Sequence, residues 1–156
     1  MTQKQQKMTK TRIKPAVLCW LASGLLTACT SEEEEKVAAQ AKAFAECYFN
    51  LHFDEAFEKC TPESRKWIVF RASNLTEGDL EAVRQAEEEA YVASINCRLT
   101  TDSTATATCK VCGMLAADSL EQTEGRILDK AEFSIPLVKR GRRWLVKMEG
   151  PLRSEE

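Results

Sequence analysis

The sequence predicts an α+β domain in which N-terminal helices pack on a curved antiparallel sheet. Up to about residue 90, apolar residues recur at spacings of three and four, the period of a helix buried on one side. Beyond that point they alternate with polar residues, the period of a strand with one buried face. The helical pattern comes first and the strand pattern follows, so the sequence lacks the βαβ alternation that would predict a parallel sheet.

A segment for export is predicted over residues 1–28. It holds five basic residues and no acidic ones, and residues 15–28 form an uncharged apolar run. A helix of that length rises about 21 Å, short of the roughly 30 Å hydrocarbon core of a bilayer. A basic head, a short apolar middle and small residues at the end are typical of a secretory signal peptide.

The end of this segment, Leu26-Thr27-Ala28-Cys29, resembles the bacterial lipobox. In that family the cysteine becomes the new N-terminus and carries a diacylglycerol and a further acyl chain such as palmitate. The resemblance implies lipid attachment at Cys29 and a place in the outer membrane of a Gram-negative envelope. Several acyl chains anchor a protein durably, whereas one chain gives only marginal binding.

Residues 29–36 continue as an acidic tether, with glutamates at positions 32–35. This stretch resembles the signal that sends some lipoproteins to the cell surface. The alternative is helix chemistry, with Ser31 as the N-cap and carboxylates in the first turn.

The remaining 128 residues contain 17 Lys and Arg against 24 Asp and Glu, a net charge near −7. An acidic domain repels phosphate backbones, so nucleic acid is not expected as a partner. Its attraction to anionic lipids is weak as well, and membrane attachment is therefore assigned to the lipid anchor.

Four helical segments are expected in the domain, which is placed at residues 37–150. The first covers 32–50, and its apolar stripe consists of Val37, Ala41, Phe44, Tyr48 and Leu51. A short helix follows over 55–60. Thr61 then caps a third helix with Pro62 at its first position, and Thr76 caps a fourth.

Four strands follow these helices. The first two, 91–100 and 104–111, form a hairpin around Thr101-Asp102-Ser103. The residues expected to face inward on the first strand are Tyr91, Ala93, Ile95, Cys97 and Leu99. A polar loop over 118–126 precedes a third strand at 131–137, where Pro136 indicates an edge or a bulge. Trp144 faces inward on the fourth, and 151–156 is a polar tail.

Two segments, residues 43–64 and 133–146, are similar to the cone-shaped superfamily of nuclear transport factor 2, which includes the SnoaL-like and cystatin-like domains. The resemblance implies a pocket between the helices and the concave sheet. Some members are enzymes and many bind ligands or proteins, so the fold alone does not decide the chemistry. The residues considered for the pocket, with ordinary core packing as the alternative, are Tyr48, His52, Trp67, Tyr91 and Trp144.

His52 is the only histidine, and with Asp54 it suggests an acid/base pair; the alternative is a solvated or capping residue. No group of residues has zinc-ligand spacing. The C-x-x-C at Cys109 and Cys112 lies in a predicted strand, not at the helix start where redox pairs occur. Nucleophile-elbow, Walker and dinucleotide motifs are absent from the sequence. No catalytic residue, metal or cofactor is therefore expected.

Disulfide bonds are expected because an exported domain meets an oxidising compartment. Cys97 and Cys109 fall on one face of the predicted hairpin, and Cys47 and Cys60 flank the corner after the first helix. The alternative is that these thiols stay reduced and pack as small apolar side chains.

The sequence thus favours a lipid-anchored envelope lipoprotein with a non-enzymatic domain that binds a small molecule or a protein. The alternatives are a pocket enzyme using His52 and Asp54, or a structural protein of an envelope assembly.

Overall fold

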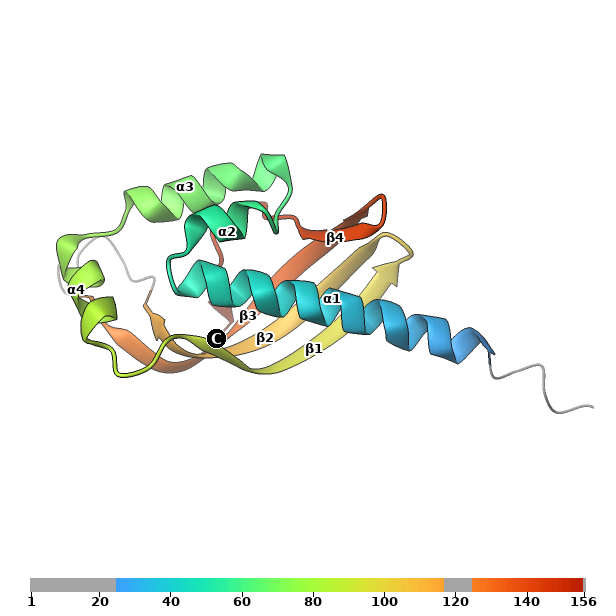
Figure 1. Ribbon diagram of the computed structural model, residues 1–156, viewed down its shortest axis with the longest axis horizontal. Helices are drawn as coiled ribbons and strands as arrows, with labels where there is room; N and C mark the ends of the chain where they lie inside the picture. Colours follow the sequence, from blue (N-terminus) through green and yellow to red (C-terminus); the bar gives the residue numbers. More distant parts are fainter. Residues whose placement is uncertain (1–24, 117–124, 156) are drawn as a thin grey trace, which may run out of the picture.

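The computed structural model describes residues 25–116 and 125–155, with side chains from Glu32 onward. The predicted signal peptide therefore lies mostly outside the described residues, as does most of the predicted polar loop. One long helix lies across the inner face of the sheet, and shorter helices lie along one side of this long helix (Figure 1). The helical elements are α1 (Leu25–Phe49), α2 (Phe53–Phe57), the 3-10 helix η1 (Pro62–Ser64), α3 (Arg65–Ser73) and α4 (Glu77–Gln85).

The apolar stripe of α1 meets the core as its spacing predicts. Val37, Ala41 and Phe44 are fully buried and Tyr48 is nearly so. The helix starts at Leu25, before the expected Glu32, so Ser31 lies inside it and the N-cap expectation is wrong. The predicted acidic tether is consequently part of a continuous helix.

α1 ends in a Schellman motif. The N–H of His52 donates to the carbonyl of Cys47 at 2.9 Å, and the N–H of Leu51 donates to Tyr48 at 3.4 Å. Leu51 takes the left-handed position of this motif with φ of 63°, where glycine is usual. The motif turns the chain sharply into α2 and leaves Leu51 only half-buried.

The strands form one antiparallel sheet in the order β1-β2-β3-β4, with β5 also paired to β3. The strands are β1 (Tyr91–Thr101), β2 (Thr104–Leu115), β3 (Ile127–Arg140), β4 (Arg143–Val146) and β5 (Ser154–Glu155). Helices packed on a curved antiparallel sheet confirm the predicted α+β class (Figure 1).

The predicted alternation of β1 holds for only part of the strand. Pairing with β2 shifts register between Val92 and Ser94. An irregularity of one residue moves every side chain before it to the other face. Ile95 and the alternate residues after it are half-buried toward the core, whereas Tyr91 and Ala93 are exposed and were wrongly placed inside.

β3 lies between β2 and β4 in the sheet, although Pro136 indicated an edge or a bulge. The carbonyl of Pro136 accepts a hydrogen bond from the N–H of Lys147, the residue after β4, at 2.9 Å. In an antiparallel strand the nitrogen and the carbonyl of one residue point to the same neighbour, so the ring nitrogen of Pro136 also points toward Lys147. Regular pairing with β4 ends at Val146, directly opposite Leu137. The missing N–H therefore falls where no ladder bond is required.

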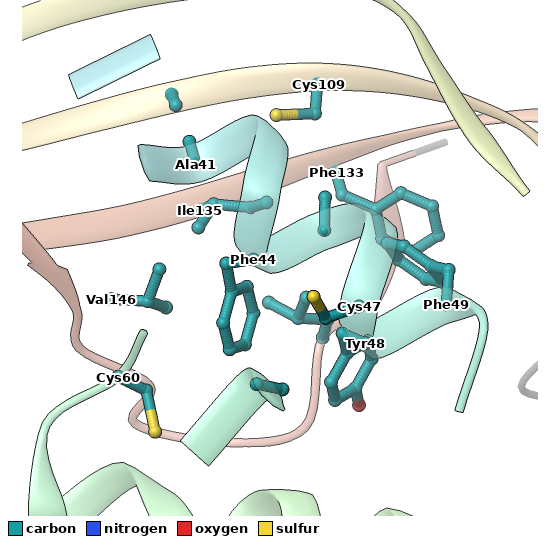
Figure 2. Packing of buried hydrophobic residues seen from close by; sticks show 14 of the residues in the cluster. Ala41, Phe44, Cys47, Tyr48, Phe49, Cys60, Cys109, Phe133, Ile135 and Val146 are labelled. Carbon is teal, nitrogen blue, oxygen red and sulfur yellow. The ribbon is translucent and has the colours of Figure 1, made fainter. Parts of the chain in front are cut away.

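The core forms where α1 crosses β2 and β3 (Figure 2). Phe49 and Phe133 have ring centroids 4.5 Å apart, and Phe44 stacks on Tyr48 at 5.6 Å. Every buried residue of this cluster lies between Val37 and Leu152. The part of the chain after Cys29 thus contains the whole described core.

The disulfide predictions are wrong: all five cysteines after Cys29 are free thiols. Cys97 lies opposite Ala107 and Cys109 lies opposite Ile95, so the two cysteines are diagonal neighbours. Diagonal pairs sit about 7–8 Å apart, beyond ordinary disulfide geometry. The thiols of Cys47 and Cys60 donate instead to a Glu55 carboxylate oxygen at 3.6 Å and to a backbone carbonyl at 3.7 Å.

A buried hydroxyl pair ties the helical layer to the sheet. The hydroxyls of Thr61 and Ser64 lie 2.8 Å apart, and both residues are fully buried. The Ser64 oxygen accepts the N–H of Met148 at 2.8 Å, and the Thr61 N–H donates to the carbonyl of Val146 at 2.9 Å. Thr61 therefore starts the helix as predicted, but its side chain bonds Ser64 and not a backbone N–H of the first turn.

Candidate functional site

Two cavities flank the C-terminal end of α1. The larger has a volume of about 560 Å³ and lies between α1, α3, the ends of β2 and β3, and the C-terminal segment. Its size is in the range of small-molecule sites. Its described lining residues are Tyr48, Phe49, Phe70, Arg71, Asn74, Met114, Leu115, Leu128, Phe133, Pro151, Leu152, Arg153 and Ser154.

Most of the wall of this cavity is apolar. Phe49, Phe133 and Met114 are buried and belong to the same core that supports α1. Phe70 on α3 is 51% exposed and therefore stands where the cavity opens. A wall anchored in the core is rigid, which favours a preformed site.

The polar groups of the cavity come from three elements. Tyr48 on α1 contributes its hydroxyl, and burial raises the pKa of Tyr48 although Arg71 and the backbone of Leu152 oppose the shift. Arg71 on α3 donates to the carbonyl of Leu115 at 3.4 Å. Arg153 and Ser154 follow on the C-terminal segment, and both are exposed.

The smaller cavity, of about 230 Å³, has a different lining. Its polar residues include His52, Asn50 and the glutamates at 87–89. The side-chain amide of Asn50 forms two hydrogen bonds with the backbone of Ala90. It donates to the Ala90 carbonyl and accepts from the Ala90 N–H, both at 2.8 Å. Asn50 thereby fixes the start of β1 against the end of α1.

The structure separates the five predicted pocket residues. Tyr48 lines the larger cavity and His52 the smaller one. Trp67, Tyr91 and Trp144 line neither. Trp67 packs edge-on to Phe70 at 6.4 Å, and its buried indole N–H has no partner among the described residues.

Tyr91 was misplaced by the register shift in β1; it is 47% exposed, on the outer face with Cys112. Asp54 is also exposed, in the first turn of α2, and lines neither cavity. The two cavities therefore do not bring His52 and Asp54 together as an acid/base pair.

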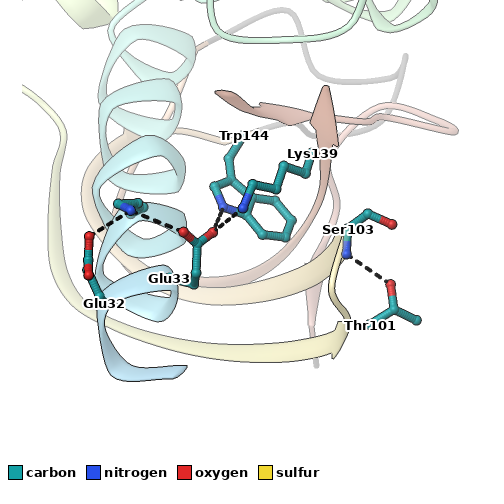
Figure 3. A network of polar contacts seen from close by, with 7 residues as sticks. Glu32, Glu33, Thr101, Ser103, Lys139 and Trp144 are labelled. Carbon is teal, nitrogen blue, oxygen red and sulfur yellow. Dashed lines mark hydrogen bonds and ion pairs between the residues drawn. The ribbon is translucent and has the colours of Figure 1, made fainter. Parts of the chain in front are cut away.

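Trp144 belongs to a polar network at the other end of α1 (Figure 3). Its indole N–H donates to a carboxylate oxygen of Glu33 at 3.0 Å, and Lys139 Nζ lies 2.6 Å from the same oxygen. Lys36 approaches the second oxygen at 3.1 Å. Bonding to Lys139, Trp144 and Lys36, in that order of effect, lowers the pKa of Glu33 from 4.5 to about 2.

The sequence missed most of the lining of the larger cavity. Leu152, Arg153 and Ser154 were assigned to a polar tail, whereas Leu152 is buried and Ser154 pairs with Phe133 of β3. The ordered domain thus extends past Gly150. An apolar Leu152 directly after Pro151 was the available signal for a chain that returns to the core.

Within residues 25–116 and 125–155, no group of three or more His, Cys, Asp or Glu side chains is placed to hold a metal ion. Among the same residues, no helix has the length and hydropathy needed to cross a membrane.

No protein-family model and no curated protein matches this sequence. Solved structures do share its fold. A protein of unknown function from Mycobacterium tuberculosis aligns with a TM-score of 0.51 and 12% identity, over 83% of this chain and 76% of that one. At this identity the similarity shows the fold alone.

Two further structures align more loosely. One is an Ntf2-like protein involved in plasmid conjugation, with a TM-score of 0.45 and 14% identity over 80% of this chain; this chain spans only 39% of its length. The other is the association domain of C. elegans CaMKII, with a TM-score of 0.43 and 12% identity, over 74% of this chain and 92% of that domain.

Proposed function

We propose that this protein is a non-enzymatic lipoprotein of the Gram-negative outer membrane, anchored through Cys29, whose domain binds a small molecule with a large apolar part. The observation that carries the binding role is the larger cavity, about 560 Å³ with a mostly apolar wall. A polar ligand of that size would leave its hydrogen-bonding groups unpaired against this wall, whereas an apolar ligand gains free energy from each apolar area it buries.

The separation of His52 and Asp54 supports a binding role over an enzymatic one. General acid/base catalysis needs both groups within reach of one substrate. Of the two cavities described above, the smaller is lined by His52 and neither is lined by Asp54. The described lining of the larger cavity contains hydroxyl and guanidinium groups but no pair of a nucleophile and a base. Such a cavity is better suited to binding a molecule than to catalysing its reaction.

The proposed lipid anchor and the larger cavity lie at opposite ends of α1, so the protein can be attached to a membrane and bind a ligand at the same time. Nineteen residues separate Cys29 from Tyr48 along this helix, a rise of roughly 28 Å. The Glu33 network fastens the early part of the helix to β3 and β4. A lipid on Cys29 would thus hold the domain at the membrane with the larger cavity away from the anchored end.

Lipidation is tested by labelling the full-length protein with a radioactive or clickable palmitate in a Gram-negative host. We expect the wild type and the Cys19→Ser control to take up label and sediment with the outer membrane. The Cys29→Ser variant should take up none and leave the membrane fraction. Label on Cys29→Ser would refute the anchor.

Ligand binding is tested with N-phenyl-1-naphthylamine, a neutral apolar dye that fluoresces in apolar sites. Residues 30–156 should bind it saturably. Leu128→Trp, which fills the larger cavity, should abolish binding, and Leu145→Trp, at a half-buried position outside the cavity, should not. Equal binding by both variants would place the dye elsewhere and refute the proposed site.

A further inference from the structure

The charge of the larger cavity contrasts with that of the domain. The chain after residue 28 has a net charge near −7, yet the described lining contains two arginines and no Asp or Glu. The smaller cavity nearby is lined by glutamates. The charged side chains in the described lining of this apolar cavity are thus all cationic, although the domain as a whole is acidic.

Arg71 sits on the last turn of α3, half-buried beside this apolar wall. Its guanidinium carries five N–H donors, and the described residues accept through one carbonyl, that of Leu115, at a long 3.4 Å. No described carboxylate forms an ion pair with it. A partly desolvated guanidinium without an anionic partner is stabilised by any anion that reaches it.

Two neighbours point to the same kind of ligand. The Tyr48 hydroxyl lines the same cavity and carries a proton that it can donate to a ligand there. Arg153, also without an ion pair to a described residue, lines the cavity from the exposed C-terminal segment. Donors from α1, α3 and the C-terminal segment therefore line one space.

We propose that the ligand is an amphiphile with an anionic head group, a carboxylate or a phosphate, bound by Arg71, Arg153 and the Tyr48 hydroxyl. The apolar part of the ligand lies against Phe49, Phe133 and Leu128. A guanidinium presents paired donors that match both anions. This inference rests on the proposed function and adds the charge and class of the ligand.

The experiment loads residues 30–156 with N-phenyl-1-naphthylamine and displaces the dye with dodecanoate, dodecyl phosphate or 1-dodecanol at pH 8. The two anions are kept below their micelle concentrations and the alcohol below its solubility limit. The three competitors share one alkyl chain and differ in the head group. We expect at least one anion to displace the dye at a concentration at least tenfold lower than the alcohol. The anion that displaces at the lower concentration identifies the preferred head group.

The arginines are tested by Arg71→Gln, Arg153→Gln and the double variant, with the exposed Arg98→Gln on β1 as the matched control. The double variant should lose the preference for the anion over dodecanol to within about twofold, with both competitors measured against the variant's own affinity for the dye. Arg98→Gln should keep the full preference. The exposed Arg153→Gln single variant tests the proposal even if Arg71→Gln fails to fold.

The outcomes separate the two proposals. If the dye binds in the cavity but all three competitors displace it equally, the anionic class is wrong and the apolar site stands. If the anion is preferred but the double variant keeps that preference, these arginines are not the head-group site. If neither the dye nor any alkyl compound binds, the proposed function fails and the inference fails with it.

Discussion

The indole N–H of Trp144 donates to the carboxylate of Glu33 at 3.0 Å, joining β4 to the early part of α1 across 111 residues of sequence (Figure 3). Lys139, next to Trp144 across the β3–β4 hairpin, completes the contact. Trp144, which the sequence suggested as a pocket residue, thus holds α1 in place. The same contact makes stability depend on pH.

The Glu33 carboxylate is expected to contribute stability that acid removes. Because its pKa falls from 4.5 to about 2 on folding, this contribution is complete above about pH 5 and is lost as the pH falls toward 2. Urea unfolding of residues 30–156 should show the wild type more stable than Glu33→Gln at pH 7, with the difference shrinking toward pH 2. Glu32→Gln, which alters only an exposed pair with Lys36, is the control. A gap between wild type and Glu33→Gln that does not change with pH would contradict this assignment.

The hydroxyl of Ser64 is expected to be a large contributor among the side-chain hydrogen bonds. Ser64→Ala leaves the buried N–H of Met148 without its acceptor, which costs about 1–3 kcal/mol of unfolding free energy. Ser73→Ala, on the exposed face of α3, should change stability by about 0.5 kcal/mol or less. Urea midpoints at constant slope measure both. Equal midpoints for the two variants would show that the buried pair is not a stabilising link.

Gly125 is expected to tolerate no side chain. A Cβ there would lie 2.6 Å from the Cα of Asp79 and 2.7 Å from the carbonyl oxygen of Gly78, both in the backbone of α4. Gly125→Ala should destabilise the domain by about 1–3 kcal/mol, as overpacked sites do. Gly150→Ala meets nothing within 4 Å and is the control. The comparison fails if thermal unfolding midpoints of the two variants coincide.

The thiol of Cys109 is expected to be inert in the folded protein. Burial, with a smaller effect of Cys97, raises the pKa of Cys109 to about 12, so almost no thiolate forms at pH 8. Iodoacetamide should leave Cys109 unmodified until the chain is denatured. Denaturation without reductant should then add five carbamidomethyl groups to residues 30–156. Fewer than five would mean that a disulfide forms after all.

Much of the fold could be read from local patterns because each pattern reports one physical constraint. Spacings of three and four placed Phe44 and Tyr48 in the core, and alternation placed Trp144 there. The Thr76 cap also forms, with Asp79 completing a capping box. These features depend on neighbours a few residues away, which a single sequence contains.

The sequence by itself determined the α+β order, the buried face of α1, the hairpin at Thr101–Thr104 and the acidic charge of the domain. Only the tertiary structure decided which residues surround the larger cavity, because Arg71 and Arg153 meet there from segments 82 residues apart. It also decided that Trp144 bonds Glu33 and that Cys109 lies two residue pairs along the β1–β2 ladder from Cys97. Such contacts depend on strand register and on helix placement over the sheet, and neither is encoded in the spacing of apolar residues along the chain.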